Sequence, residues 1–420
     1  MTSRETVRGG VVIAIAMGVT NVTTYGFTIL AARVLGPAEY GALAAVMGLL
    51  LVVNVLSLGL QATGARRVSA APDRRLTIER EVMTTSYWSA LALGVVALLA
   101  TPLVTSTLNL DSWGAAALIA VTAVPLSVMG GQAGILQGER RWAPLAAIYL
   151  AVGIGRLGFG AIALVVEPNT FGAMVGVAVG AVVPVVIGWF ALRHPSRRTG
   201  QVDEPEASRP SPWARGGVLR ETFHNSHALL AFFALSNCDV VIARSTLDEH
   251  QAGLYAGGLI LTKAVLFLPQ FVVVIAFPSM SKRDAGRRMH LTSLGAVFAI
   301  GVVTVAATAA LSALALVFVG GSQYADLQGR LWIFACLGTL LAMIQLLIYN
   351  IVARQRQRTV LLIWAALVAL LAVSPFLNSL DALVSTVVTI DTVLFLVLLG
   401  RSLAPSYHRK VEDPEPAGRR

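Results

Sequence analysis

Long apolar stretches recur along almost the whole chain, and they limit its possible fold more than any other feature. A helix needs roughly 20 apolar residues to cross a bilayer core about 30 Å thick. Stretches of this length alternate with short polar segments, and 56% of the 420 residues are hydrophobic whereas 13% are charged. One soluble core cannot bury so much apolar surface. The sequence therefore predicts an all-α polytopic membrane protein.

About twelve membrane-spanning helices are expected, in two groups of six that a polar connector separates. The first six cover residues 11–32, 40–60, 82–105, 113–136, 142–166 and 170–192. The second six cover residues 223–243, 252–280, 291–319, 331–352, 360–377 and 382–400.

The positions of the basic residues predict how the chain is oriented in the membrane. With the N-terminus in the cytoplasm, all but five of the 32 Lys and Arg residues fall in cytoplasmic segments. Loops rich in Lys and Arg stay on the cytoplasmic side of a membrane. Both termini are therefore expected in the cytoplasm. The net charge of +10 is read as this orientation signal, and nucleic acid is not an expected partner.

The polar connector and the polar tail divide the chain into four expected parts. Residues 1–192 form one six-helix half, residues 193–221 a cytoplasmic linker, residues 222–400 the other six-helix half, and residues 401–420 a disordered cytoplasmic tail. Prolines, serines and charged residues dominate the linker. Such a composition buries too little apolar surface to fold by itself.

The two halves share a short sequence pattern. Arg33 ends the first expected helix and Gly41 opens the next, while Arg244 ends the seventh helix and Gly253 opens the eighth. The pattern falls at the same point of each six-helix half. It predicts parallel repeats related by an axis along the membrane normal.

Two glycine patterns are interpreted as helix packing. Gly153, Gly155 and Gly158 have the spacing of a dinucleotide-binding turn, but they fall inside an expected membrane helix with no strand before them. A second set of glycines lies on one face of the sixth helix, where small residues let neighbouring helices approach closely. This set comprises Gly172, Gly176, Gly180 and Gly188.

Ionisable residues inside the expected helices are the strongest functional signal. Each costs roughly 2.5 to 3.5 kcal/mol at a helix centre, so such residues usually face a cavity or a partner. They are Arg156, Lys263, Asp239 and Asp391. Asp239 and Lys263 could neutralise each other as a structural ion pair, or at least one of the cations could bind a substrate or an ion. A pair could serve both purposes.

Arg156 and Lys263 lie in opposite halves, so a two-fold bundle allows both to face one central cavity. Two cations among hydroxyl and amide groups suit an anionic, hydroxyl-rich substrate such as a glycan on a pyrophosphate. The expected substrate-binding residues are Arg156, Lys263, Asn21 and Asn237, and the candidate ion-coupling residues are Asp239 and Asp391. Further polar side chains fit either a cavity wall or hydrogen bonds between helices; they are Thr23, Thr24, Asn54, Gln61, Gln345 and Asn350.

Motifs of enzymes are missing from the sequence. It contains no GxxxxGK[ST], HExxH or GxSxG pattern, and the expected outward loops are too short for a catalytic domain. Cys238 and Cys336 both fall in apolar runs, which suggests neither a disulfide framework nor a thiolate metal site. The chain is therefore expected not to be an enzyme, and to use neither a cofactor nor a metal.

Two segments carry a resemblance to a known family. Residues 33–41 read RVLGPAEYG, which resembles the RxLGPxEYG turn after the first helix of polysaccharide and oligosaccharide flippases in the multidrug/oligosaccharidyl-lipid/polysaccharide (MOP) superfamily. Asp239, Arg244 and residues 253–256 are similar to a pattern in the second half of the same family. The layout of twelve helices also agrees.

The resemblance implies a transport function by alternating access in the bacterial plasma membrane. Two six-helix halves would rock around a cationic cavity and flip a polyprenyl-linked oligosaccharide from the cytoplasmic to the outer leaflet, for cell-surface polysaccharide assembly. The lipid tail would stay in the bilayer. Expected partners are the glycan carried on a polyprenyl phosphate or pyrophosphate and the membrane lipids. A polysaccharide polymerase or glycosyltransferases are candidate partners.

Three other functions stay open at this point. A drug or cation antiporter of the same superfamily would favour an acidic cavity. A major-facilitator carrier also has twelve helices, but residues 65–81 lack the Gly-rich loop that such carriers have. A membrane scaffold for polysaccharide enzymes would not need Arg156 or Lys263.

Overall fold

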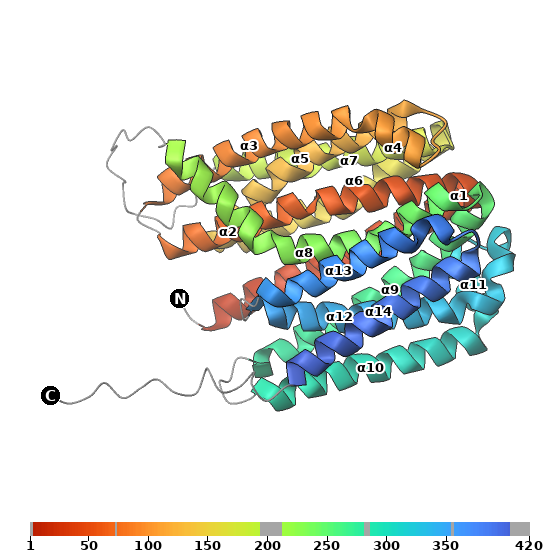
Figure 1. Ribbon diagram of the computed structural model, residues 1–420. Helices are drawn as coiled ribbons and strands as arrows, with labels where there is room; N and C mark the ends of the chain where they lie inside the picture. The colour runs from red at the N-terminus through yellow and green to blue at the C-terminus, as the bar shows by residue number, and fades with distance from the viewer. Residues whose placement is uncertain (1–2, 72–73, 194–211, 281–285, 354–356, 404–420) are drawn as a thin grey trace.

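The chain folds into a bundle of long helices, as Figure 1 shows. The computed structural model describes residues 3–71, 74–193, 212–280, 286–353 and 357–403. Within these ranges every regular element is helical, so the predicted all-α fold is confirmed. Residues 401–403, expected in a disordered tail, are instead the end of the last helix, whereas the rest of that tail and most of the expected linker lie outside the described residues.

Two sets of helices follow each other along the chain, and we call them the first half and the second half. The first half comprises α1 Ser3–Val53, α2 Val55–Ala70, α3 Arg75–Leu99, α4 Thr101–Thr107, α5 Trp113–Gly138, α6 Trp142–Val166 and α7 Thr170–Arg193. The second half comprises α8 Pro212–Thr246, α9 Glu249–Met280, α10 Gly286–Ala310, α11 Ser312–Val319, η2 Ser322–Arg330, α12 Leu331–Ala353, α13 Gln357–Val373, η3 Ser374–Phe376 and α14 Leu380–Leu403.

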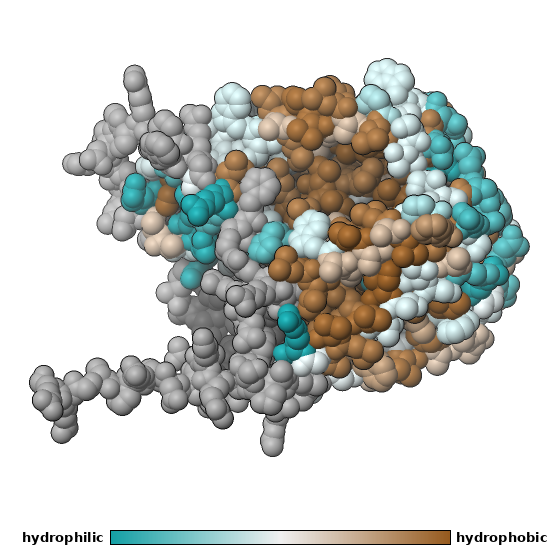
Figure 2. All heavy atoms as spheres, viewed as in Figure 1, coloured by the Kyte–Doolittle hydropathy of each residue, from teal (hydrophilic) through white to brown (hydrophobic). Residues whose placement is uncertain are grey.

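The helices are long and apolar enough to cross a membrane. Among the described residues nine stretches meet both criteria, and the first of them, Gly9–Ala70, contains two arms. Counting these two arms separately gives ten spans. The shorter helix Val360–Phe376 and α9 bring the number among the described residues to the predicted twelve. Figure 2 shows the consequence on one face, where hydrophobic side chains form a wide band across the bundle.

The two arms of the first stretch meet at Gly36. There the backbone leaves the helical region with φ 72° and ψ 176°, a conformation that glycine adopts without steric cost. Pro37 follows and has no N–H to donate to the preceding turn. The Gly36-Pro37 pair therefore ends the first arm, as the sequence predicts. We call the end of the bundle where α1 begins and α14 ends the terminal end, and the opposite end, near Gly36, the far end (Figure 1).

Several predicted spans are divided in the structure: the one expected at 40–60 is interrupted at Asn54 between α1 and α2, and the one expected at 360–377 comprises α13 and η3. The span expected at residues 82–105 is split at Ala100 into α3 and α4, and the span expected at 291–319 is split at Leu311 into α10 and α11. Pro102 lies in the first turn of α4, where a missing N–H costs nothing. Each half thus has a short helix at the far end, at the same position in its helix order.

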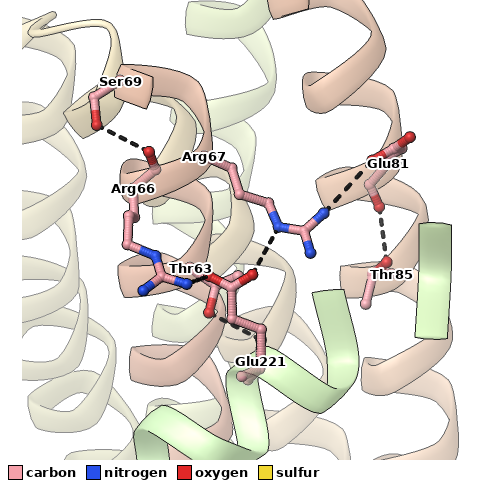
Figure 3. A network of polar contacts seen from close by, with 8 residues as sticks. Thr63, Arg66, Arg67, Ser69, Glu81, Thr85 and Glu221 are labelled. Atoms are coloured by element: carbon pink, nitrogen blue, oxygen red, sulfur yellow. Dashed lines mark hydrogen bonds and ion pairs between the residues drawn. The ribbon is translucent and has the colours of Figure 1, made fainter. Parts of the chain in front are cut away.

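The predicted linker is shorter than the sequence suggested, because α8 begins at Pro212 and includes the linker residues 212–221. Tertiary contacts hold this first part of α8 against the first half (Figure 3). Glu221 forms ion pairs with Arg66 and with Arg67, where Nε of Arg67 donates over 3.0 Å. Arg67 also lies 3.7 Å from Glu81 of α3. These charges join α2, α3 and α8 at the terminal end.

The glycine patterns serve helix packing, as predicted. A Cβ atom at Gly153 would lie 2.2 Å from Oγ1 of Thr23 in α1, and one at Gly180 would lie 2.8 Å from the backbone of Gly155. Only glycine permits such close approach of α6 to α1 and α7. Of the three glycines with dinucleotide-like spacing, Gly153 and Gly155 therefore serve close contact between helices, whereas a Cβ at Gly158 would meet no atom within 4 Å.

Candidate functional site

A cavity of about 150 Å³ lies where α1 meets α6, α8 and α9. Arg156 of α6 lines it from the first half, and Lys263 of α9 lines it from the second half. Asn21 of α1 lines it too. The structure thus brings three of the expected substrate-binding residues to one cavity between the halves.

One face of the first arm of α1 supplies most of the uncharged polar groups in this cavity. Asn21, Thr24, Tyr25 and Thr28 all line it. Their spacing of three and four residues places them on the same helix face. Sequence reasoning singled out Asn21 and Thr24 but missed Tyr25 and Thr28. The helical spacing from Asn21 was the signal that could have found them.

Arg156 lies next to a close contact between two helices that a pair of glycines makes. Gly155 approaches the backbone of Gly180 in α7, so α6 and α7 are close at this level. Arg156 also borders a second, much smaller cavity of about 10 Å³ that Thr122 of α5 lines. Within the described residues its guanidinium has no hydrogen-bond or ion-pair partner. The charge is therefore available to a substrate.

Lys263 is held in position by Asn237. Its Nζ donates to Oδ1 of Asn237 over 2.9 Å, while Nδ2 of Asn237 donates to the carbonyl oxygen of Phe233 over 2.9 Å. Asn237 is 3% exposed and lies behind Lys263, away from the cavity surface. The neutral amide of Asn237 thus positions the Lys263 ammonium group without neutralising its charge.

Asp239 and Asp391 form a buried acidic pair in the second half. Their exposed fractions are 2% and 3%. The hydroxyl of Tyr255 donates to Oδ2 of Asp239 over 2.8 Å, and the two carboxylates are close enough for their charges to repel. Within the described residues no hydrogen bond or ion pair joins Asp239 to Lys263, although their charges are close enough to attract each other.

The cavity is cationic. Arg156 and Lys263 line it, and no acidic side chain is found among the described residues that do so. The described part of the chain also contains no group of three His, Cys, Asp or Glu side chains that could hold a metal ion. An anionic group is therefore the ligand that this lining favours.

Other polar candidates serve contacts between helices. Nε2 of Gln61 donates to Oε1 of Gln137 over 2.9 Å and to the hydroxyl of Tyr149 over 2.6 Å, which joins α2, α5 and α6. Thr23 donates to the carbonyl oxygen of Val19 in its own helix. The side chain of Asn350 lies outside the described residues.

The RxLGPxEYG segment is architectural. Arg33 and Glu39 do not bind each other, since Nη2 of Arg33 donates to the carbonyl oxygen of Val317 over 2.7 Å. Oε2 of Glu39 accepts from the N–H of Thr170 over 2.8 Å and from its hydroxyl over 2.6 Å. Glu39 therefore satisfies the first turn of α7, where N–H groups lack partners.

A family model described as polysaccharide biosynthesis protein matches residues 6–284. The match covers more than half of the chain and includes all the residues that line the cavity. The chain belongs to this polysaccharide biosynthesis protein family. Among curated proteins, no sequence relative matches this member of the family.

Solved structures show that this polysaccharide biosynthesis protein has the fold of MOP-superfamily transporters. An inward-facing multidrug resistance MATE family transporter of that superfamily is 14% identical, covers 93% of this chain and 96% of its own, and gives a TM-score of 0.70. An outward-facing one is 14% identical, with 94% and 95% coverage and a TM-score of 0.64. The eukaryotic MATE transporter AtDTX14 is 14% identical, with 95% coverage of each chain and a TM-score of 0.57. At these identities the likeness is one of fold.

Proposed function

We propose that the protein flips a polyprenyl-linked oligosaccharide from the cytoplasmic to the outer leaflet, for cell-surface polysaccharide assembly. The observation that carries this proposal is the cavity with Arg156 from one half and Lys263 from the other. A cavity with a cation on each side binds an anionic headgroup between the two halves. Movement of the halves changes the distance between the two cations and can therefore release the headgroup. Membership of the polysaccharide biosynthesis protein family supports a glycan as the cargo.

The phosphate groups of the carrier are the part that the two cations bind. Hydrogen bonds between charged groups are short and about twice as strong as neutral ones. The hydroxyl and amide groups on α1 bind sugar hydroxyls, which both donate and accept. Moving a diphosphate outward also gains roughly 2.3 kcal/mol per charge for each 100 mV of inside-negative potential. Transport therefore requires no nucleotide hydrolysis.

The lipid tail stays outside the cavity, beside the first arm of α1. One face of this arm lines the cavity, while Val11, Ile15 and Val22 on the arm are strongly exposed apolar side chains. A polyprenyl chain gains by contact with such a surface and has no reason to enter a cationic cavity. The headgroup and the tail therefore occupy different sides of one helix.

The terminal end faces the cytoplasm of a bacterial cell in this proposal, and the protein lies in the plasma membrane. Only Arg33, Arg244 and Arg330 among the Lys and Arg residues fall in the segments at the far end. The positive-inside rule favours this orientation. Both chain termini are then cytoplasmic, near the enzymes that assemble the glycan.

Asp239 and Asp391 couple transport to a proton or sodium gradient in this proposal. Coupling between an ion and a substrate is typically 5- to 150-fold in affinity. We expect Asp239→Asn and Asp391→Asn each to lower gradient-driven transport in vesicles at least about tenfold. Asp381→Asn, a change at an exposed carboxylate of α14, is the matched control and should have no effect. Full gradient-driven transport by both buried variants would rule out the coupling role.

Depletion of the protein from its native bacterium tests the transport function itself. Lipid-linked glycan should accumulate in the cytoplasmic leaflet, because its synthesis continues while flipping stops. The measurement is the amount of lipid-linked glycan in each leaflet, with a strain complemented by the intact chain as control.

Two rival functions give different results in this experiment. If the lipid-linked pools stay unchanged while export of cationic drugs falls, the protein is an antiporter, which would agree with its likeness in fold to multidrug resistance transporters. The depleted strain can also be complemented with the Arg156→Ala, Lys263→Ala double variant. If this variant prevents the accumulation as well as the intact chain does, the cavity is not the site, and a scaffold for polysaccharide enzymes is favoured.

A further inference from the structure

Two arginines at the far end make equivalent contacts, each with the half of the bundle to which it does not belong. Nη2 of Arg33, in the first half, donates to the carbonyl oxygen of Val317 in α11 of the second half over 2.7 Å. Nε of Arg244, in the second half, donates to the carbonyl oxygen of Leu108 at the end of α4 of the first half over 2.9 Å. Nη2 of Arg244 donates to the next carbonyl, of Asn109, over 3.0 Å. Each arginine thus crosses to the short helix of the other half.

The equivalence continues beyond the arginines. Glu39 accepts a hydrogen bond from the first residue of α7, and Gln251 accepts one from Leu380, the first residue of α14, over 3.2 Å. Gly41 and Gly253, each two residues further on, pack backbone to backbone, since a Cβ at Gly41 would lie 2.9 Å from Cα of Gly253. The repeated sequence pattern therefore corresponds to a repeated set of contacts around the junction of the halves.

The acceptors explain why arginine is used. The last carbonyl groups of a helix have no partner in the helix and carry a partial negative charge. A guanidinium offers several donors in a fixed plane, and a hydrogen bond to a charged group is stronger than a neutral one. Such contacts between halves close the far end, together with the hydroxyl of Tyr324, which donates to the carbonyl oxygen of Ala32 over 3.3 Å.

We infer that Arg33 and Arg244 are a pair of latches, related by the internal repeat, that hold the far end closed and must both release before it opens. The inference rests on the proposed function in one respect, that the far end opens during transport. No substrate is needed for the latches to act, because every contact is made within the chain.

The two latches differ in strength. Arg244 is 4% exposed and also pairs with Glu249 over 2.9 Å, whereas Arg33 is exposed and its side chain makes one hydrogen bond across the halves, to Val317. Removing the hydrogen bonds of a buried arginine costs more than removing those of an exposed one. Within the described part of the chain, Nη1 of Arg244 is buried without a hydrogen-bond partner, which makes the closed state less stable than one with every donor paired. Arg244 is therefore the stronger latch, yet one that can release.

The test measures the distance between spin labels across the far end, in lipid nanodiscs without substrate. Labels are placed at Thr107→Cys in the first half and Ala325→Cys in the second half, both exposed, with Cys238 and Cys336 replaced by alanine. Arg244→Gln should raise the ratio of the open, long-distance population to the closed one roughly tenfold, and Arg33→Gln should raise it less. The control is Arg330→Gln, at an arginine of the same end that pairs with Asp381 within the second half; it should leave the distances unchanged.

Folding is checked by thermal unfolding and gel filtration of each variant. If Arg244→Gln does not fold, Arg244→Lys replaces it, because lysine keeps the charge but cannot reach both carbonyl oxygens with a planar donor pair. Unchanged distances in both Arg33→Gln and the Arg244 variant would overturn the inference. If these variants open the far end but the intact protein moves no glycan, the inference about the latches stands and only the proposed function is rejected.

Discussion

Replacing Lys263 or Arg156 with alanine should lower transport of lipid-linked glycan roughly 10- to 100-fold, because each change removes a charge that binds the phosphate groups. A hydrogen bond to a charged group contributes about 1.5 to 3 kcal/mol, and every 1.4 kcal/mol is a factor of ten. Both residues line the cavity, and among the described residues no acidic side chain lines it with them. The measurement is the initial rate of flipping in proteoliposomes.

Three further variants show whether charge is the cause. Lys263→Arg keeps the charge and should retain most of the rate. Asn237→Ala leaves the charge but frees the ammonium group, so we expect a smaller loss than with Lys263→Ala. Arg401→Ala removes an exposed arginine from the last turn of α14 and should have no effect. Equal rates for Arg156→Ala, Lys263→Ala and Arg401→Ala would contradict a cationic binding site.

Gly253→Ala should strongly destabilise the protein, since the halves meet here through backbone atoms. A Cβ at this position would lie 1.9 Å from the carbonyl oxygen of Pro37, which is far inside van der Waals contact. Overpacking a well-filled site typically costs 1 to 3 kcal/mol, and a backbone neighbour has little freedom to move aside. We expect a clear fall in the midpoint of thermal unfolding in detergent.

The matched control is Gly295→Ala in α10, where a Cβ would meet no atom within 4 Å. Alanine is a better helix former than glycine by about 0.5 to 1 kcal/mol, so this variant should be as stable as the original chain or more stable. If Gly253→Ala proved as stable as Gly295→Ala, the close backbone contact between α1 and α9 would be wrong.

Much of the fold follows from local sequence signals. Apolar stretches of sufficient length predict the spans because the bilayer leaves a chain few other ways to satisfy its backbone groups. The helix predicted at residues 142–166 has those bounds in the structure, as Trp142–Val166. Gly36 and Pro37 predict the turn at the far end, since backbone freedom and a missing N–H are properties of single residues.

Contacts between distant segments modified this outline. Glu221 belongs to a polar stretch that cannot fold by itself, but ion pairs with Arg66 and Arg67 hold it in the helix α8. Composition describes what a segment can bury alone, and it says nothing of partners elsewhere in the chain. The start of α8 was therefore placed wrongly from the sequence.

The candidate site was only partly readable for the same reason. The cost of a charge in a membrane singles out Arg156 and Lys263 whatever their surroundings, so the sequence alone determines these two candidate binding residues. Which polar groups join them depends on how each helix is rotated and what packs against it. Tyr25 therefore lines the cavity while Thr23 binds its own helix, and Asn237 supports Lys263 from behind. Such choices are made by packing between helices far apart in the chain, which only the tertiary structure contains.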